Sequence, residues 1–120
     1  MRAMIFSLCV ALSLGVPFFG VVKAQGGDVQ AGAELHKQEC QRCHGPEGKG
    51  DGPAGKLLKA TPADWTDPER MGPVTDDTLF KAIKEGGKAV ELSGQMPEFG
   101  SKLSDDEIHN LIAFVRSLSK

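Results

Sequence analysis

The sequence predicts an all-α fold with about three main helices joined by short turns. Residues 28–39, 75–85 and 104–118 each start at an Asp, Thr or Ser residue, the side chains that typically cap the start of a helix. No part of the 120 residues shows the alternation of apolar and polar residues that is typical of a half-buried strand. A chain of this length, without an internal repeat, is typical of a single domain.

The first 24 residues predict a secretory signal peptide that is removed from the mature protein. Arg2 gives a positively charged start, residues 4–22 are mostly apolar, and small residues precede the expected cleavage point. The alternative is an uncleaved membrane anchor, because the apolar run is nearly long enough to span a bilayer. Pro17 interrupts the run and favours cleavage. We therefore expect residues 25–120 to form the domain, in the periplasm or otherwise exported.

The charge of the chain argues against nucleic acid as a partner. Loss of the predicted signal peptide removes Arg2 and Lys23 and no acidic residue, so the formal net charge moves from −2 to −4. A protein with this charge has no basic field to attract phosphate groups. We also expect that the mature form does not span a membrane.

Each expected helix has its own start and stop signals. Asp28 can cap the first helix, and Thr75 can cap the second, which ends at Gly86. Ser104 and Glu107 have the spacing of a capping box at the start of the last helix. That helix has apolar residues at the spacing of one helical face: Ile108, Leu111, Ile112, Val115 and Leu118.

Residues 40–44 carry the strongest chemical signal. They read Cys-Gln-Arg-Cys-His, which is the pattern of a haem c attachment site. Cys40 and Cys43 can each form a thioether with one vinyl group of the same haem, and His44 can then bind the iron. A zinc finger would need further ligands at finger spacing, and a thioredoxin-like motif would follow a buried strand. The motif therefore predicts one covalently bound haem c, around which the helices are wrapped.

Residues 45–55 contain five glycines, and part of this run resembles nucleotide-binding motifs. Both the G-x-G-x-x-G pattern and the P-loop pattern require a preceding strand, and the P-loop also requires Ser or Thr where Leu57 stands. We reject nucleotide binding and attribute the glycines to close approach of the backbone to the haem. His44 is expected to donate its other ring N–H to a backbone carbonyl, for which Pro53 is a candidate. For Trp65 we consider both a place at the haem edge and ordinary core packing.

Met96 is the candidate for the second iron ligand. It lies 52 residues after His44, in a loop over residues 93–100 that is rich in turn residues. A thioether sulfur is a soft ligand that suits haem iron. Met71 is the rival. The two remaining histidines, His36 and His109, lie on expected helices and have no evident reason to face the iron.

Three lysines follow one another on the second expected helix and just beyond it. Lys81, Lys84 and Lys88 are spaced by three and four residues, which places them on one side of a helix. Such a row is usually only a solvated face. The alternative is a docking patch for an acidic partner protein.

Four segments together resemble the class I mono-haem cytochromes c. They are the helix before residues 40–44, the run over residues 45–54, the loop over residues 96–100 and the helix over residues 104–118. The resemblance covers residues 28–118. It implies that His44 and Met96 are the axial ligands, and that Gly32 meets Phe114 where the first and last helices cross. His36 departs from the family, which usually has an aromatic residue there.

The resemblance implies a one-electron carrier and not an enzyme. Two protein ligands would leave the iron no open position for a substrate. Redox partner proteins would then dock transiently over a small interface. The alternatives are an electron-transfer haem subunit of a larger dehydrogenase or oxidase complex, and a haem enzyme or gas sensor whose sixth ligand is labile.

Overall fold

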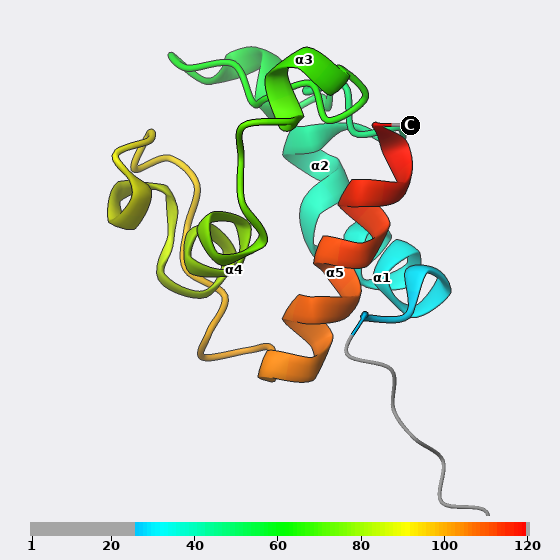
Figure 1. Ribbon diagram of the computed structural model, residues 1–120. Helices are drawn as coiled ribbons and strands as arrows, with labels where there is room; N and C mark the ends of the chain where they lie inside the picture. The colour runs from blue at the N-terminus through cyan, green and yellow to red at the C-terminus, as the bar shows by residue number, and fades with distance from the viewer. Residues whose placement is uncertain (1–25, 120) are drawn as a thin grey trace, which may run out of the picture.

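A computed structural model describes residues 26–119, and this range contains helices and turns but no β-strand (Figure 1). The expected all-α fold is confirmed, and the predicted signal peptide lies outside the described residues. Within that range no helix is long and apolar enough to cross a membrane. The helical elements are α1 Val29–Leu35, η1 His36–Cys40, α2 Gln41–His44, η2 Gly55–Leu57, α3 Pro68–Met71, α4 Asp76–Glu85, η3 Gly87–Val90 and α5 Asp105–Leu118.

The first expected helix is present, and it continues into the haem motif. The side chain of Asp28 caps α1 by accepting a hydrogen bond from the backbone N–H of Ala31 at 3.0 Å. The π-helical segment η1 then joins α1 to α2 without a break. The helical run ends at Gly45, whose φ of 80° suits glycine. Residues 40–44 are thus held at the end of a helix.

Helices α1 and α5 cross and pack against each other, as the resemblance implies (Figure 1). The backbone N–H of Asp28 donates a hydrogen bond to the side chain of Asn110 at 2.7 Å. Gly32 lies against Phe114 and against the backbone of Asn110. The predicted capping box of Ser104 and Glu107 is present at the start of α5. This crossing fixes the position of α5 beside the haem motif.

The core consists of two groups of buried side chains that meet along α5. The larger group joins α4 to α5 and contains Ile83, Leu103, Ile108, Leu111 and Ile112. The smaller group contains Trp65, Met71 and Val115. Met71 belongs to α3, a short helix that the sequence did not predict. Asp67 caps this short helix and Pro68 occupies its first position, both of which favour a helix start.

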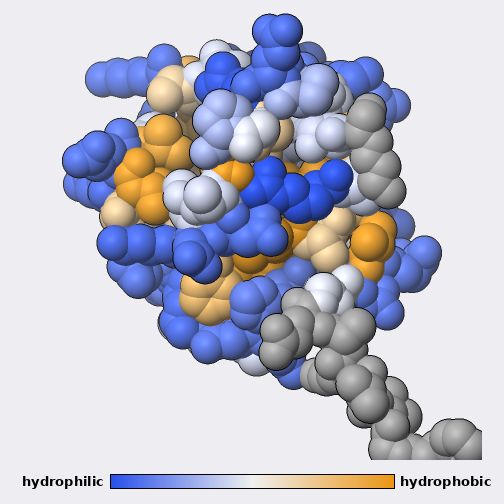
Figure 2. All heavy atoms as spheres, in the orientation of Figure 1, coloured by the Kyte–Doolittle hydropathy of each residue, from blue (hydrophilic) through white to orange (hydrophobic). Residues whose placement is uncertain are grey.

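The middle lysine of the row, Lys84, already has an acidic partner within the protein. Lys84 pairs with Asp105 of α5 at 2.7 Å, and its ammonium group lies 5.2 Å from the ring centre of Phe80. Lys81 and Lys88 are exposed. Hydrophilic side chains cover most of the face seen in Figure 2, with hydrophobic atoms visible between them. Two of the three lysines therefore remain accessible to a partner.

Candidate haem site

Cys40, Cys43, His44 and Met96 line a single cavity of about 390 Å³. Its remaining lining is largely apolar and comes from α3, α4, α5 and the loops between them. In Figure 1 these elements surround one region, with α2 and the loop of residues 91–99 on opposite sides of it. A volume of this size lies within the range of about 300–1,000 Å³ that is usual for ligand and cofactor sites. The structure thus brings all four predicted site residues together.

The two cysteines lie one helical turn apart on the same continuous helical run. Cys40 ends η1 and Cys43 belongs to α2, and both are free thiols. Burial, together with the nearby carboxylate of Glu39, raises the pKa of Cys40 to about 12. This thiol is therefore neutral at pH 7. Because a thioether is also neutral, its formation would place no charge against the apolar lining.

His44 is half-buried and its imidazole is neutral at pH 7, as an iron ligand must be. Desolvation, with a smaller contribution from nearby His36, lowers the pKa of His44 to about 4. Its Nδ1 atom is buried and has no hydrogen-bond partner among residues 26–119. The expected bond to a backbone carbonyl, including that of Pro53, is therefore not present. The N–H groups of Gly52 and Ala54 instead tie this loop to the carbonyl oxygens of α2, at 3.2 and 3.0 Å.

The glycines after the motif serve backbone packing and do not contact the haem cavity. A Cβ atom added to Gly52 would lie 2.7 Å from the carbonyl oxygen of Cys43 and would clash with Arg42. In the part of the chain that the structure describes, no glycine lines the cavity. The expectation that these glycines let the backbone approach the haem is therefore wrong. Gly52 and Gly55 let the loop lie directly on α2.

Trp65 is part of the core, which confirms the second expectation for it, and it also lines the cavity. Its ring stacks on that of His44, with ring centres 4.1 Å apart and planes inclined by 19°. Sequence reasoning placed Trp65 near the haem but did not find this stack. The residues are separated by a long loop, and no local pattern indicates the contact.

Met96 comes from a loop that is held in place by main-chain hydrogen bonds. The N–H of Gly87 donates to the carbonyl oxygen of Met96 at 3.1 Å, and the N–H of Phe99 donates to the carbonyl oxygen of Ile83 at 2.9 Å. Met71 also lines the cavity but packs in the group that contains Trp65. The Met96 loop therefore has a fixed course relative to α4.

Neither of the spare histidines lines the cavity. His36 is buried in η1, whereas His109 is exposed and packs over the ring of Phe80 with ring centres 5.0 Å apart. Sequence reasoning missed two charged residues of the cavity wall. They are Glu39 of η1 and Arg70, which belongs to the unpredicted helix α3.

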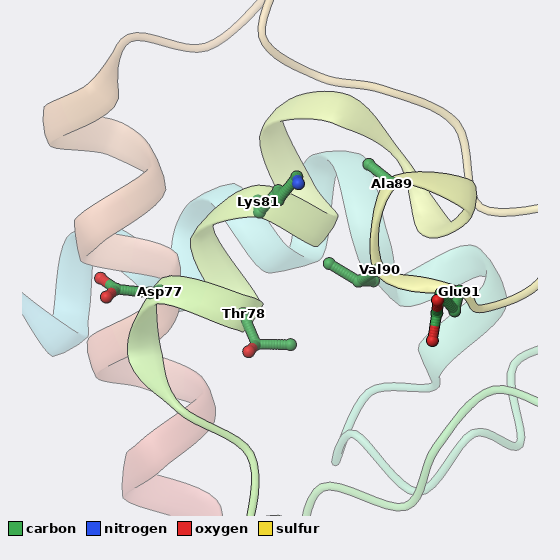
Figure 3. A pocket seen from close by; sticks show the side chains of 6 residues that line it. All are labelled: Asp77, Thr78, Lys81, Ala89, Val90 and Glu91. Atoms are coloured by element: carbon green, nitrogen blue, oxygen red, sulfur yellow. The ribbon is translucent and has the colours of Figure 1, made fainter.

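A second hollow, of about 400 Å³, lies over α4 and η3 (Figure 3). Asp77 and Glu91 lie on opposite sides of it in this view. Its lining contains no cysteine, histidine or methionine: the residues are Asp77, Thr78, Lys81, Ala89, Val90 and Glu91. This hollow therefore has none of the groups that could hold a haem iron.

The residues of the first cavity fit a haem c. The donor set contains two thiols for attachment, a neutral imidazole and a thioether. The imidazole carries a buried nitrogen without a partner, and the surrounding wall is apolar. This combination suits a flat, largely apolar cofactor that contains iron.

Comparisons with known proteins agree with this chemistry. The chain is 27% identical over 106 residues to a cytochrome c of Gibberella zeae, covering 79% of this chain and 98% of that protein. It is 26% identical over 97 residues to the gluconate 2-dehydrogenase cytochrome c subunit of Pantoea cypripedii. That match covers 77% of this chain but spans only 21% of the length of the subunit.

A solved structure and a family model point to the same class. The structure of KustC0563, a c-type cytochrome, is 29% identical with a TM-score of 0.61, covering 74% of this chain and 98% of that one. The family model described as cytochrome C oxidase, cbb3-type, subunit III matches residues 27–115. The chain belongs to that family, and with it to the class I c-type cytochromes.

Proposed function

We propose that this protein is an exported one-electron carrier whose residues 25–120 form a cytochrome c domain after removal of the signal peptide. The observation that carries the proposal is the single cavity lined by Cys40, Cys43, His44 and Met96. When bound, the haem supplies an iron that changes between the ferric and ferrous states. The chain itself catalyses no reaction in this proposal.

Cys40 and Cys43 would hold one haem covalently, and His44 of α2 would bind its iron. The low pKa of His44 supports this role, because the imidazole needs to lose no proton before it binds the metal. The apolar wall keeps water away from the iron. When little water surrounds a buried site, few water molecules have to reorient as the charge of the site changes.

Met96 is the second axial ligand in this proposal. Met71 packs in the same buried group as Trp65, and the ring of Trp65 lies against His44. Met71 therefore lies on the same side of the cavity as His44. The loop that contains Met96 lies on the other side of the region from α2 (Figure 1). A second iron ligand would have to come from the side of the cavity away from His44, and the position of the Met96 loop therefore favours Met96 over Met71.

The test is addition of carbon monoxide to the reduced, haem-loaded protein, followed by its optical spectrum. We expect an unchanged spectrum for the wild-type protein, because both axial positions are held. Met96→Ala should bind carbon monoxide rapidly, and Met71→Ala should not. Rapid binding by the wild-type protein would contradict the carrier proposal and favour a haem enzyme or gas sensor.

A second candidate is an electron-transfer subunit of a larger complex. The similarity to the cytochrome c subunit of a gluconate 2-dehydrogenase favours it. The same residues would hold the haem in either case, so the site does not separate the two. Purification of the tagged chain from its native source distinguishes them, because a subunit should elute with a stable dehydrogenase or oxidase partner and a free carrier should elute alone.

A further inference from the structure

A row of aromatic rings connects α5 to His44. The ring of Phe114 lies 4.9 Å from that of His36, and the ring of His36 lies 5.8 Å from that of Trp65 in an edge-to-face arrangement. Trp65 in turn stacks face to face on His44, with ring centres 4.1 Å apart. Rings at these distances attract one another and resist rotation. The last ring of the row is the proposed proximal ligand of the iron.

The indole ring of Trp65 is held from several sides. Its exposed fraction is 9%, and it packs with Met71 and Val115. Its backbone N–H donates to the carbonyl oxygen of Gly48 at 2.8 Å, which ties it to the loop that follows the haem motif. A closely packed interior of this kind leaves a large ring one orientation. Trp65 therefore presents a fixed flat surface to His44.

Within residues 26–119, Trp65 is the one aromatic ring that packs on the ring of His44. A metal-bound imidazole usually donates its second ring nitrogen to a carbonyl or carboxylate, and this bond sets the ring orientation. In His44 the buried Nδ1 atom has no such partner within residues 26–119. The stack on Trp65, with planes inclined by only 19°, is the contact that limits rotation of the ring.

We infer that Trp65 is a positioning residue that sets the plane of the His44 imidazole at the iron. This inference rests on the proposed function, because it requires His44 to be an axial ligand. In ferric haem the orientations of the two axial ligands together decide which pyrrole rings receive most of the unpaired spin, so with Met96 unchanged a change in the pattern reports a change in the imidazole plane. The pattern of the haem methyl shifts in the proton NMR spectrum therefore reports the orientation that Trp65 imposes.

The experiment compares this pattern among haem-loaded ferric proteins. Trp65→Phe keeps a flat ring and should preserve the order of the methyl shifts. Trp65→Met keeps bulk without a flat ring, and it should change the order of the shifts or broaden them. Leu118→Ala is the matched control, because Leu118 packs in the same buried group but does not line the cavity. It should lower stability and leave the pattern unchanged.

Two results would overturn the inference. One is an unchanged methyl pattern in Trp65→Met. The other is the absence of nuclear Overhauser contacts between the indole protons of Trp65 and the ring protons of His44 in the ferrous wild-type protein. This second measurement does not depend on whether the Trp65→Met variant accumulates. A wild-type protein without a low-spin spectrum, or with an open iron position, would instead count against the proposed function.

Discussion

Gly32 of α1 lies directly against the backbone of Asn110 in α5. A Cβ atom at position 32 would overlap with the carbonyl oxygen of Asn110 and lie 2.9 Å from the Cβ atom of Phe114. Alanine in place of glycine within a helix normally stabilises by about 1 kcal/mol. Overpacking of a close contact typically costs about 1–3 kcal/mol. The contact involves rigid backbone, so the unfavourable effect should dominate.

We therefore predict that Gly32→Ala lowers the free energy of unfolding of the haem-loaded protein. Guanidinium chloride denaturation, followed by the haem absorbance, measures the change. Gly26→Ala is the control, because a Cβ atom there would meet nothing within 4 Å. A Gly32→Ala variant that is as stable as the control would show that the two helices can separate without cost.

His36 should make stability depend on pH. Burial lowers the pKa of His36 from its usual value of 6.5, opposed by a hydrogen bond to the Gly45 backbone, so the folded state binds its proton less readily than the unfolded state. The stability linked to this group is therefore present above pH 6.5 and decreases as the pH falls below it. Its Nε2 atom is also buried without a partner in the described structure, which typically costs about 1–3 kcal/mol.

His36→Phe should consequently be more stable than the wild-type protein at pH 7.5, and the difference should increase at pH 5. Denaturation at the two pH values measures both effects. His109→Gln serves as the control, because it removes an exposed histidine and leaves His36 in place. A stability difference between His36→Phe and the wild-type protein that is smaller at pH 5 than at pH 7.5 would contradict the prediction.

Arg116 of α5 holds the backbone next to α3, which forms part of the cavity wall. Its guanidinium group donates to Asp76 at 2.7 Å, to the carbonyl oxygen of Met71 at 3.1 Å and to that of Val74. Lysine keeps the charge but cannot form this planar set of bonds. Since each hydrogen bond contributes about 0.5–1.5 kcal/mol, Arg116→Lys should destabilise the protein by about 1–3 kcal/mol.

In Arg116→Lys we expect faster hydrogen exchange at residues 71–74 and a lower free energy of unfolding in denaturation experiments. Lys102→Gln is a suitable comparison, because Lys102 forms a partly exposed ion pair with Glu39 at 2.6 Å. An exposed pair contributes only about 0–1 kcal/mol. If the two variants lose the same stability, the bonds to the Met71 and Val74 carbonyls contribute little.

The accessible lysines beside α4 give a prediction about partners. Reversing the charge at Lys81 and Lys88 should slow electron transfer to an acidic partner at low salt, and the difference should fade at high salt. Lys84 is left unchanged because it pairs with Asp105. Stopped-flow kinetics at several ionic strengths measures the effect. A control variant with the same net charge, reversed at the exposed residues Lys37 and Lys56, should transfer electrons faster than the Lys81 and Lys88 variant at low salt.

The sequence indicated those parts of the fold that depend on local signals. Asp28, Thr75 and Ser104 cap the helices that they were expected to cap, because a cap and a helical period need only neighbouring residues. The four candidate site residues, which line one cavity, could be named from the sequence because they belong to short motifs with a chemical reason for each position. Helix α3 was missed because four residues are too few to show a period.

The contacts that shape the site were beyond sequence reasoning because they join distant residues. The stack of Trp65 on His44 depends on the course of the whole loop between them. The role of the glycines was misjudged for the same reason, since only the folded loop shows that Gly52 meets the backbone of α2. Burial of His36 between two rings likewise has no counterpart in the neighbouring sequence.

The loop that contains Met96 is fastened through its main chain, at the carbonyl oxygen of Met96 and the N–H of Phe99. Every residue carries a backbone carbonyl, and every residue except proline carries a backbone N–H, so these hydrogen bonds do not depend on the side chain. The course of the loop is therefore largely independent of which residue stands at position 96. Under the proposed function, in which Met96 binds the iron, substitution at this position would exchange that ligand and retune the affinity of the iron for the electron, while the scaffold remains intact.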